Sequence, residues 1–104
     1  DGGVAVVSML THDMDGLQSW VRGALGPLVT DTAGHQRLRE TVHTFFTHDR
    51  HHAATAAALN IHRNTLKYRL EKAEAVRGRP LDADRLDLEL ALQVCQYLGS
   101  SILE

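Results

Sequence analysis

The sequence has a single cysteine, Cys95, among its 104 residues, so no disulfide can form within the chain. This scarcity fits a reducing compartment, and we expect a cytoplasmic protein. No apolar run approaches the roughly 18 residues that a membrane span requires, which predicts no membrane association. The apolar segment 4–10 is short and lacks a basic leader, so it does not have the pattern of a signal peptide.

Residue clusters that could bind a metal or catalyse a reaction are also missing. His48, His51 and His52 are close in the sequence, but a zinc site usually needs four ligands, and Cys95 is remote from them. The carboxylates of residues 82–89 are expected to cap one helix and line its solvated edge, and no glycine-rich phosphate loop is present. We therefore expect no catalytic residues, no metal, no cofactor and no enzymatic activity.

The charge that is present is unevenly distributed. The formal net charge of −2 is ordinary, but residues 50–79 carry seven basic and two acidic side chains, a local charge of +5. The flanking residues 1–49 and 80–104 carry −3 and −4. Because the local field governs attraction to phosphates more than the net charge does, this basic segment predicts a nucleic-acid-binding element. The competing interpretation is a basic helix face that only contacts solvent.

Two amphipathic helices are predicted in the first half of the chain. Residues 13–25 form the first, and Gly26 and Pro27 end it. The second runs from residue 32 or 33 to 48, with Asp31 or Thr32 as its cap. The expected inward-facing residues are Leu17, Trp20, Val21, Ala24, Leu25 and Leu28 in and after the first helix, and Leu38, Val42, Phe45 and Phe46 in the second.

The two ends of the chain carry further elements. Residues 4–9 (VAVVSM) predict a short strand or extended arm, which would need a preceding domain or a symmetry mate to pair with. Asp82 is predicted to cap a last helix that ends near Leu98 and Gly99. Apolar residues cover roughly 240° of this helix, more than the roughly 100° that one-sided packing needs. It therefore packs either on a partner subunit as well as its own core, or centrally within one chain.

The segment between residues 53 and 78 has the layout of a helix-turn-helix. An alanine-rich helix is followed by a tight turn at residues 59–61 and by a second helix over residues 62–77, which Gly78 ends. The alanines are expected to let the two helices cross closely. Four side chains are expected to form the shared packing wedge: Leu59, Ile61, Leu66 and Leu70.

The second helix presents polar side chains outward, with DNA donors near its start. Arg63, Asn64 and Lys67 are predicted to read bases, since Arg binds guanine and Asn binds adenine bidentately. His62 is placed at the N-cap, and Tyr68 is open between packing and a backbone contact. The residues predicted to contact the DNA backbone are His62, Thr65, Arg69 and Lys72.

The run LNIHRNTLKYRL at residues 59–70, followed by Glu74 and Gly78, resembles the C-terminal DNA-binding domain of the PucR family of bacterial transcriptional regulators. The resemblance covers about residues 15–98. It implies an all-helical module at the end of a longer regulator, with an effector-sensing region upstream. A looser similarity to the Fis-type helix-turn-helix implies that His62, Arg63 and Thr65 face DNA. One departure is His51-His52, where the family often has Asn or Ser.

These observations predict an all-α bundle of about five helices containing a helix-turn-helix, with a short N-terminal extended segment. Residues 1–12 would be an arm or the tail of a preceding domain, 13–99 the DNA-binding domain and 100–104 a C-terminal tail. Since the chain begins with Asp1, we expect it to be part of a longer protein. The predicted function is sequence-specific binding of double-stranded DNA by a homodimeric transcriptional regulator. The alternative is a helical protein-interaction or oligomerisation module that does not bind DNA.

Overall fold

The computed structural model describes residues 12–103. Five α-helices and two short 3₁₀ helices make up this part of the chain, and it contains no strand, so the all-α prediction is confirmed. The predicted arm at residues 4–9 lies outside the described residues. The elements are α2 (Met14–Leu25), η1 (Gly26–Val29), α3 (Ala33–Thr47), α4 (His52–Leu59), α5 (Arg63–Arg77), α6 (Arg85–Leu98) and η2 (Gly99–Ser101).

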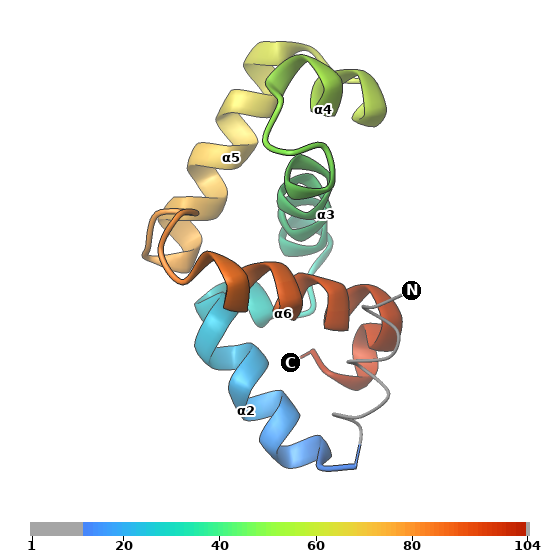
Figure 1. The fold of residues 1–104 in the computed structure, drawn as a ribbon, viewed down its shortest axis with the longest axis vertical. Coiled ribbons are helices and arrows are strands. Elements are labelled where there is room, and N and C mark those ends of the chain that lie inside the picture. Colours follow the sequence, from blue (N-terminus) through green and yellow to red (C-terminus); the bar gives the residue numbers. More distant parts are fainter. Residues whose placement is uncertain (1–11, 104) are drawn as a thin grey trace.

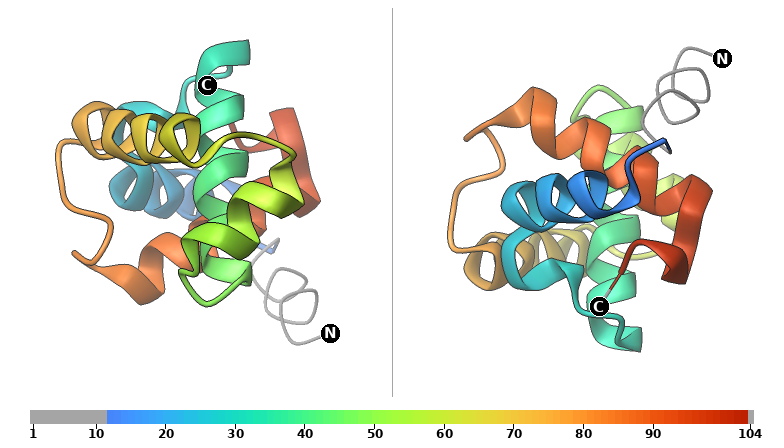
Figure 2. Two further views of the ribbon diagram at one scale, coloured as in Figure 1. Left: turned by 90° about the horizontal axis from the view of Figure 1, so that it is seen from above. Right: turned by 90° about the horizontal axis from the view of Figure 1, so that it is seen from below.

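The helices form an elongated bundle with principal extents of 40 × 28 × 24 Å. In Figure 1, α4 and the start of α5 lie at one end of the long axis, α2 lies toward the other end, and α6 crosses between them. Figure 2 shows α5 crossing α3 in the view from above and α2 lying across α6 in the view from below, and both pairs are in contact. The bundle thus presents α4 and α5 at one end of the molecule.

Local capping explains where the first helices begin and end. The Gly16 N–H donates to the Asp13 carboxylate at 2.9 Å, and the His35 N–H donates to the Thr32 hydroxyl at 3.1 Å. These bonds satisfy backbone donors that the first helical turn leaves open. At the end of α2, Gly26 has φ 58° and ψ −141°, a conformation that other residues avoid. The sequence-based positions of both helices are confirmed.

The start of the last helix differs from the prediction. Helix α6 begins at Arg85, and Asp82 lies in the preceding loop without capping it. The Leu81 N–H donates to the Glu74 carboxylate at 2.7 Å, and the Arg77 guanidinium donates to the Pro80 and Ala83 carbonyls. These bonds to α5 hold the loop in a turn, so the N-cap is Asp84 and the helix begins two residues later than predicted.

The wide apolar surface of α6 is used mainly inside the chain. Helix α6 packs against α2, α3 and η2, and Leu88, Ala91, Leu92 and Val94 are buried. Leu86 and Tyr97 are exceptions, with 68% and 47% of their surfaces exposed. The structure therefore favours the central-helix interpretation over a second buried face on a partner. No helix in the described part of the chain is long and apolar enough to cross a membrane.

Candidate nucleic-acid interface

The turn between α4 and α5 is built by two residues with distinct backbone roles. Asn60 ends α4 in the left-handed conformation, at φ 55°. A short polar side chain tolerates this conformation better than most residues do. The Ile61 N–H then donates to the Ala56 carbonyl at 3.0 Å, which closes the turn. The two helices are therefore held in a fixed relation by the chain segment that joins them.

His62 caps the start of α5 with its side chain. The Asn64 N–H donates to His62 Nδ1 at 3.0 Å, so Nδ1 acts as the acceptor. A neutral imidazole whose Nδ1 accepts a hydrogen bond carries its proton on Nε2. The ring is exposed, so this Nε2–H is available to an acceptor outside the protein. The cap thus defines both the start of the helix and the orientation of one surface donor.

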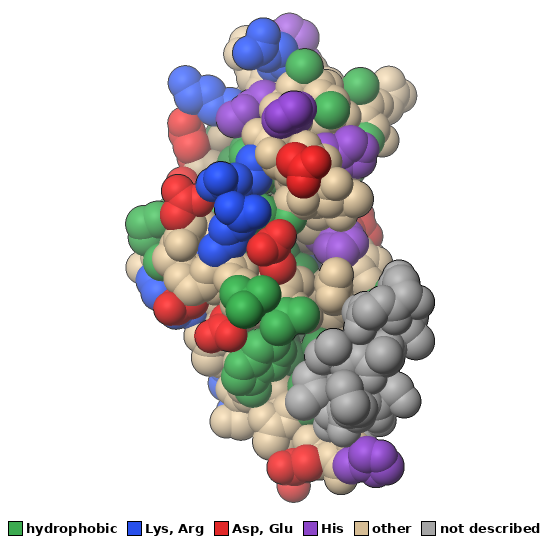
Figure 3. Space-filling model, viewed as in Figure 1, with side chains coloured by type: hydrophobic (Ala, Val, Ile, Leu, Met, Phe, Trp, Pro, Cys, Tyr) green, Lys and Arg blue, Asp and Glu red, His purple; other side chains and the backbone are tan. Residues whose placement is uncertain are grey.

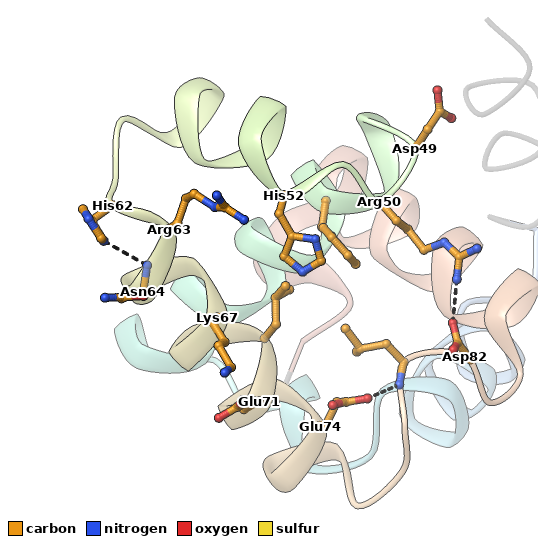
Figure 4. Close-up of a pocket in the computed structure, with 13 residues that line it drawn as sticks. Asp49, Arg50, His52, His62, Arg63, Asn64, Lys67, Glu71, Glu74 and Asp82 are labelled. Atoms are coloured by element: carbon orange, nitrogen blue, oxygen red, sulfur yellow. Dashed lines mark hydrogen bonds and ion pairs between the residues drawn. The ribbon is translucent and has the colours of Figure 1, made fainter.

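The three predicted base-reading residues lie together on one flank of α5. Arg63, Asn64 and Lys67 are exposed and line a groove of about 1060 Å³ between α5, the start of α4 and the loop before α6. His62 lies at the same end of this groove (Figure 4). The groove is also lined by Phe45, Asp49, Arg50, His52, Leu70, Glu71, Glu74, Leu81 and Asp82.

The other predicted backbone contacts lie outside the residues that line the groove. Thr65 and Lys72 are exposed, and Arg69 is half-buried. At about 100° per residue, the three project from the opposite flank of α5. The structure therefore places the predicted DNA residues along both sides of one exposed helical ridge, with His62 at its start. Figure 3 shows most Lys, Arg and His side chains of the visible face toward the α4 and α5 end.

The packing residues of the motif are buried to different degrees. Leu66 is completely buried and Leu70 nearly so, whereas Leu59 and Ile61 are half-buried against the core. Of the five alanines in α4, only Ala56 is buried, so close helix crossing does not explain the other four. Thr55 accompanies Ala56 in the interface and is fully buried. The short helix α4 therefore packs through a narrow strip.

Tyr68 projects away from the protein. It is 61% exposed, so the packing interpretation of this residue is wrong. On the wheel of α5 it lies near Asn64, on the outermost part of the exposed ridge. An aromatic ring with a hydroxyl can contact either a thymine methyl or a phosphate oxygen.

The sequence patterns did not predict the groove residues that lie on elements other than α5. The Phe45 and His52 rings meet edge-on with centroids 5.2 Å apart, and the Arg50 guanidinium forms an ion pair with Asp82 at 2.8 Å. Local sequence patterns cannot predict an ion pair between residues that are 32 positions apart in the chain. The two ends of the groove differ in chemistry. His62, Arg63 and Lys67 lie toward the start of α5, whereas the acidic Glu71, Glu74 and Asp82 lie toward the loop before α6.

Burial changes the pKa of Cys95 and His43, two side chains that do not line the groove. Burial raises the pKa of the Cys95 thiol to about 11, with a smaller opposing effect from Arg39, so Cys95 stays protonated at neutral pH. Burial also lowers the pKa of His43, which favours its neutral form. Within residues 12–103, no group of three or more His, Cys, Asp or Glu side chains is arranged to hold a metal ion.

Comparisons with known proteins converge on one family. The sequence model of the PucR C-terminal helix-turn-helix domain matches residues 38–94. The transcriptional activator PmfR of Paenarthrobacter nicotinovorans is 39% identical over 89 residues, covering 84% of this chain and 19% of that protein. The carbohydrate diacid regulator of Escherichia coli K12 is 46% identical over 59 residues, covering 55% and 15%.

A third relative, the uncharacterized protein YsfB of Bacillus subtilis, is 44% identical over 63 residues, covering 61% of this chain and 17% of that protein. The chain therefore spans less than a fifth of the length of each of these three relatives. No solved structure gives a significant match.

Proposed function

The chain belongs to the PucR C-terminal helix-turn-helix family of transcriptional regulators, and on this premise we propose that it binds double-stranded DNA sequence-specifically, with α5 in the major groove. Membership supports a DNA-binding regulatory role. The observation that carries the finer proposal is the exposed ridge of α5, whose capped start carries Arg63 and Asn64 beside Lys67.

Base reading is assigned to the residues nearest the start of α5. Arg63 can donate two hydrogen bonds to guanine O6 and N7, and Asn64 can pair with adenine N6 and N7. Lys67, one turn later, reaches a base or a phosphate. These side chains are exposed, and no intramolecular ion pair occupies either cation among the described residues. Arg63 and Lys67 can therefore contact DNA without first breaking an internal ion pair.

Backbone contacts are assigned to four residues around this centre. The His62 Nε2–H and the Thr65 hydroxyl lie in or beside the first turn of α5, where the positive end of the helix dipole favours a phosphate. Arg69 and Lys72 extend the same surface along the opposite flank. Such contacts orient the helix but carry no base information.

The remaining parts of the proposal concern the parent protein. Residues 13–99 would form the DNA-binding domain of a longer cytoplasmic regulator, with an effector-sensing region upstream and without enzymatic activity. Residues 1–12 would be an extended arm or the tail of a preceding domain, and 100–104 would be a C-terminal tail whose Ile102 packs in the core. Two such domains in a homodimer would contact half-sites about 34 Å apart, or a multiple of that spacing.

The proposal is tested by fluorescence anisotropy of the chain with the promoter DNA next to its own gene and with a random duplex. We expect tighter binding to the promoter, and the logarithm of the association constant should fall by about 0.9 per logarithm of salt for each phosphate neutralised. Equal, weak binding to both duplexes would contradict sequence reading by the isolated chain.

The alternative is a protein-interaction or oligomerisation module, and the exposed Leu86 on α6 is the observation that favours it. Binding through such an apolar surface would depend little on salt. No DNA binding even at low salt, together with salt-insensitive self-association, would replace the DNA-binding proposal with this one.

A further inference from the structure

The groove beside α5 contains an arginine that the proposed interface does not use. Arg50 projects from the loop between α3 and α4, and its guanidinium donates to the Asp82 carboxylate at 2.8 Å. Asp82 belongs to the loop between α5 and α6, so the pair joins two loops that border the groove (Figure 4). Arg63, Lys67 and His52 line the same groove.

Backbone hydrogen bonds fix the turn that carries Arg50. Asp49 and Arg50 both have left-handed conformations, with φ of 53° and 62°. These conformations end α3, because the Asp49 N–H donates to the Phe46 carbonyl and the Arg50 N–H donates to the Phe45 carbonyl at 2.8 Å. The hydrogen-bonded turn places Arg50 directly after α3, where its side chain lines the groove.

The ion pair itself contributes little to folding. The side chains of Arg50 and Asp82 are 42% and 76% exposed. Ion pairs with this much solvent contact are weak, because water and salt screen them and two side chains must be ordered. Either partner can therefore exchange for another ion with little effect on the fold.

We propose that Arg50 is a further ligand of the DNA backbone, and that Asp82 occupies its guanidinium until a phosphate of the bound strand replaces the carboxylate. The inference rests on the proposed function. It adds Arg50 to the DNA-contacting residues and identifies the Asp82 carboxylate as a competitor of the phosphate. Carboxylate and phosphate oxygens both accept charge-assisted hydrogen bonds from guanidinium, so the exchange preserves the type of contact.

The neighbouring charges determine where this phosphate would lie. Arg63 and Lys67 line the same groove and attract a phosphate toward its part near the start of α5. Glu71 and Glu74 repel it from the part near the loop before α6. Arg50 lines the same groove as these basic and acidic side chains. Asp82, which already pairs with its guanidinium, can therefore compete with a phosphate for it.

The test measures DNA binding by three single variants and one double variant of the 104-residue chain. Arg50→Gln removes the proposed ligand and Asp82→Asn removes the competitor. Asp87→Asn is the matched control, because it removes one exposed carboxylate that does not line the groove. Each variant is titrated with promoter and random duplexes over a range of salt concentrations.

We expect Arg50→Gln to weaken binding to both duplexes by roughly five- to tenfold at 0.1 M salt and to reduce the salt slope by about 0.9. Asp82→Asn should tighten binding by about two- to fivefold more than Asp87→Asn does. This excess should disappear in the Arg50→Gln background, because the competitor then has no arginine to hold.

An unchanged salt slope in Arg50→Gln would overturn the inference, as would equal gains from Asp82→Asn with and without Arg50. Failure of the wild-type chain to bind either duplex would instead contradict the proposed function. Circular dichroism melting of each variant identifies any loss of folding. A single methylphosphonate scan of the duplex gives a second readout, since one neutralised phosphate should abolish the effect of Arg50→Gln.

Discussion

At the residue scale, substitutions can separate the capping role of His62 from its proposed role in DNA binding. Its Nδ1 accepts the Asn64 N–H and stabilises the start of α5, while its Nε2–H is available to DNA. Asparagine is a good N-cap residue, whereas alanine is a poor one. Stability and DNA affinity should therefore respond differently to these two substitutions.

We expect His62→Ala to lower the free energy of unfolding by about 1 kcal/mol, because the cap is lost. His62→Asn should change it by only a few tenths of a kcal/mol, yet weaken DNA binding as much as the alanine variant does. Urea unfolding and anisotropy measure the two effects. An asparagine variant with wild-type affinity would remove His62 from the DNA contacts.

Arg63 and Lys72 should differ in specificity. Arg63→Ala is expected to weaken binding to the promoter by about 1–3 kcal/mol and to relax selectivity at one base pair. Lys72→Ala should weaken promoter and random DNA alike, because a phosphate contact carries no base information. Competition titrations against single-base operator variants distinguish the two. Equal losses on specific and random DNA for Arg63→Ala would contradict its base-reading role.

The half-buried thiol of Cys95 predicts a dependence of stability on pH. Its folded pKa of about 11 lies above the usual value for an exposed thiol, about 8.5. The unfolded chain therefore releases this proton first, and the stabilising contribution, complete below about pH 8.5, is lost as the pH rises toward 11. Urea midpoints between pH 7 and 10 should fall more steeply for wild type than for Cys95→Ala. Parallel curves would exclude this coupling.

At the element scale, the junction between α2 and η1 lies directly against the end of α5. A Cβ added to Gly26 would lie 3.0 Å from the Arg77 carbonyl oxygen at the end of α5, and Gly26 has a positive φ. Gly23, three residues earlier in α2, has open space where a Cβ would be placed. The same substitution should therefore have opposite effects at the two positions.

We expect Gly26→Ala to destabilise the fold by about 1–3 kcal/mol, because the residue would be forced into a strained conformation. Gly23→Ala should stabilise it by about 0.5–1 kcal/mol, since alanine is favoured over glycine inside a helix. Thermal and urea unfolding of both variants test this contrast. A neutral Gly26→Ala would show that α2 and α5 can separate at low cost.

At the scale of the whole molecule, Arg77 joins three parts of the bundle. Its buried guanidinium donates to the Ala24 carbonyl of α2 and to the Pro80 and Ala83 carbonyls of the loop before α6. Burial also lowers the pKa of this guanidinium. The side chain therefore links the end of α5 to the elements that support it.

Arg77→Met should destabilise the protein by about 2–4 kcal/mol, because three carbonyls would lose a donor, two of them in partly buried positions. Arg37→Met, at an exposed position of α3, should change stability by less than about 0.5 kcal/mol. Chemical denaturation of both variants provides the comparison. Similar small effects would mean that water replaces the guanidinium at these carbonyls.

Elements whose causes are local could be predicted from the sequence. Caps, glycine stops and 3.6-residue periodicity depend on neighbours within a turn or two, so α2, α3 and the layout of α4 and α5 could be predicted. The basic residues of the motif and its LNIHRNTLKYRL run are likewise contiguous, so the family could be identified before the fold.

Features that join distant residues depend on how the helices pack and could not be predicted. The delayed start of α6 depends on bonds from Glu74 and Arg77 to the loop, and the Arg50–Asp82 pair spans 32 positions. The exposure of Tyr68 and of most alanines in α4 likewise follows from which helix faces meet. Periodicity tells which residues share a face, but only the packing of all the helices decides what covers that face.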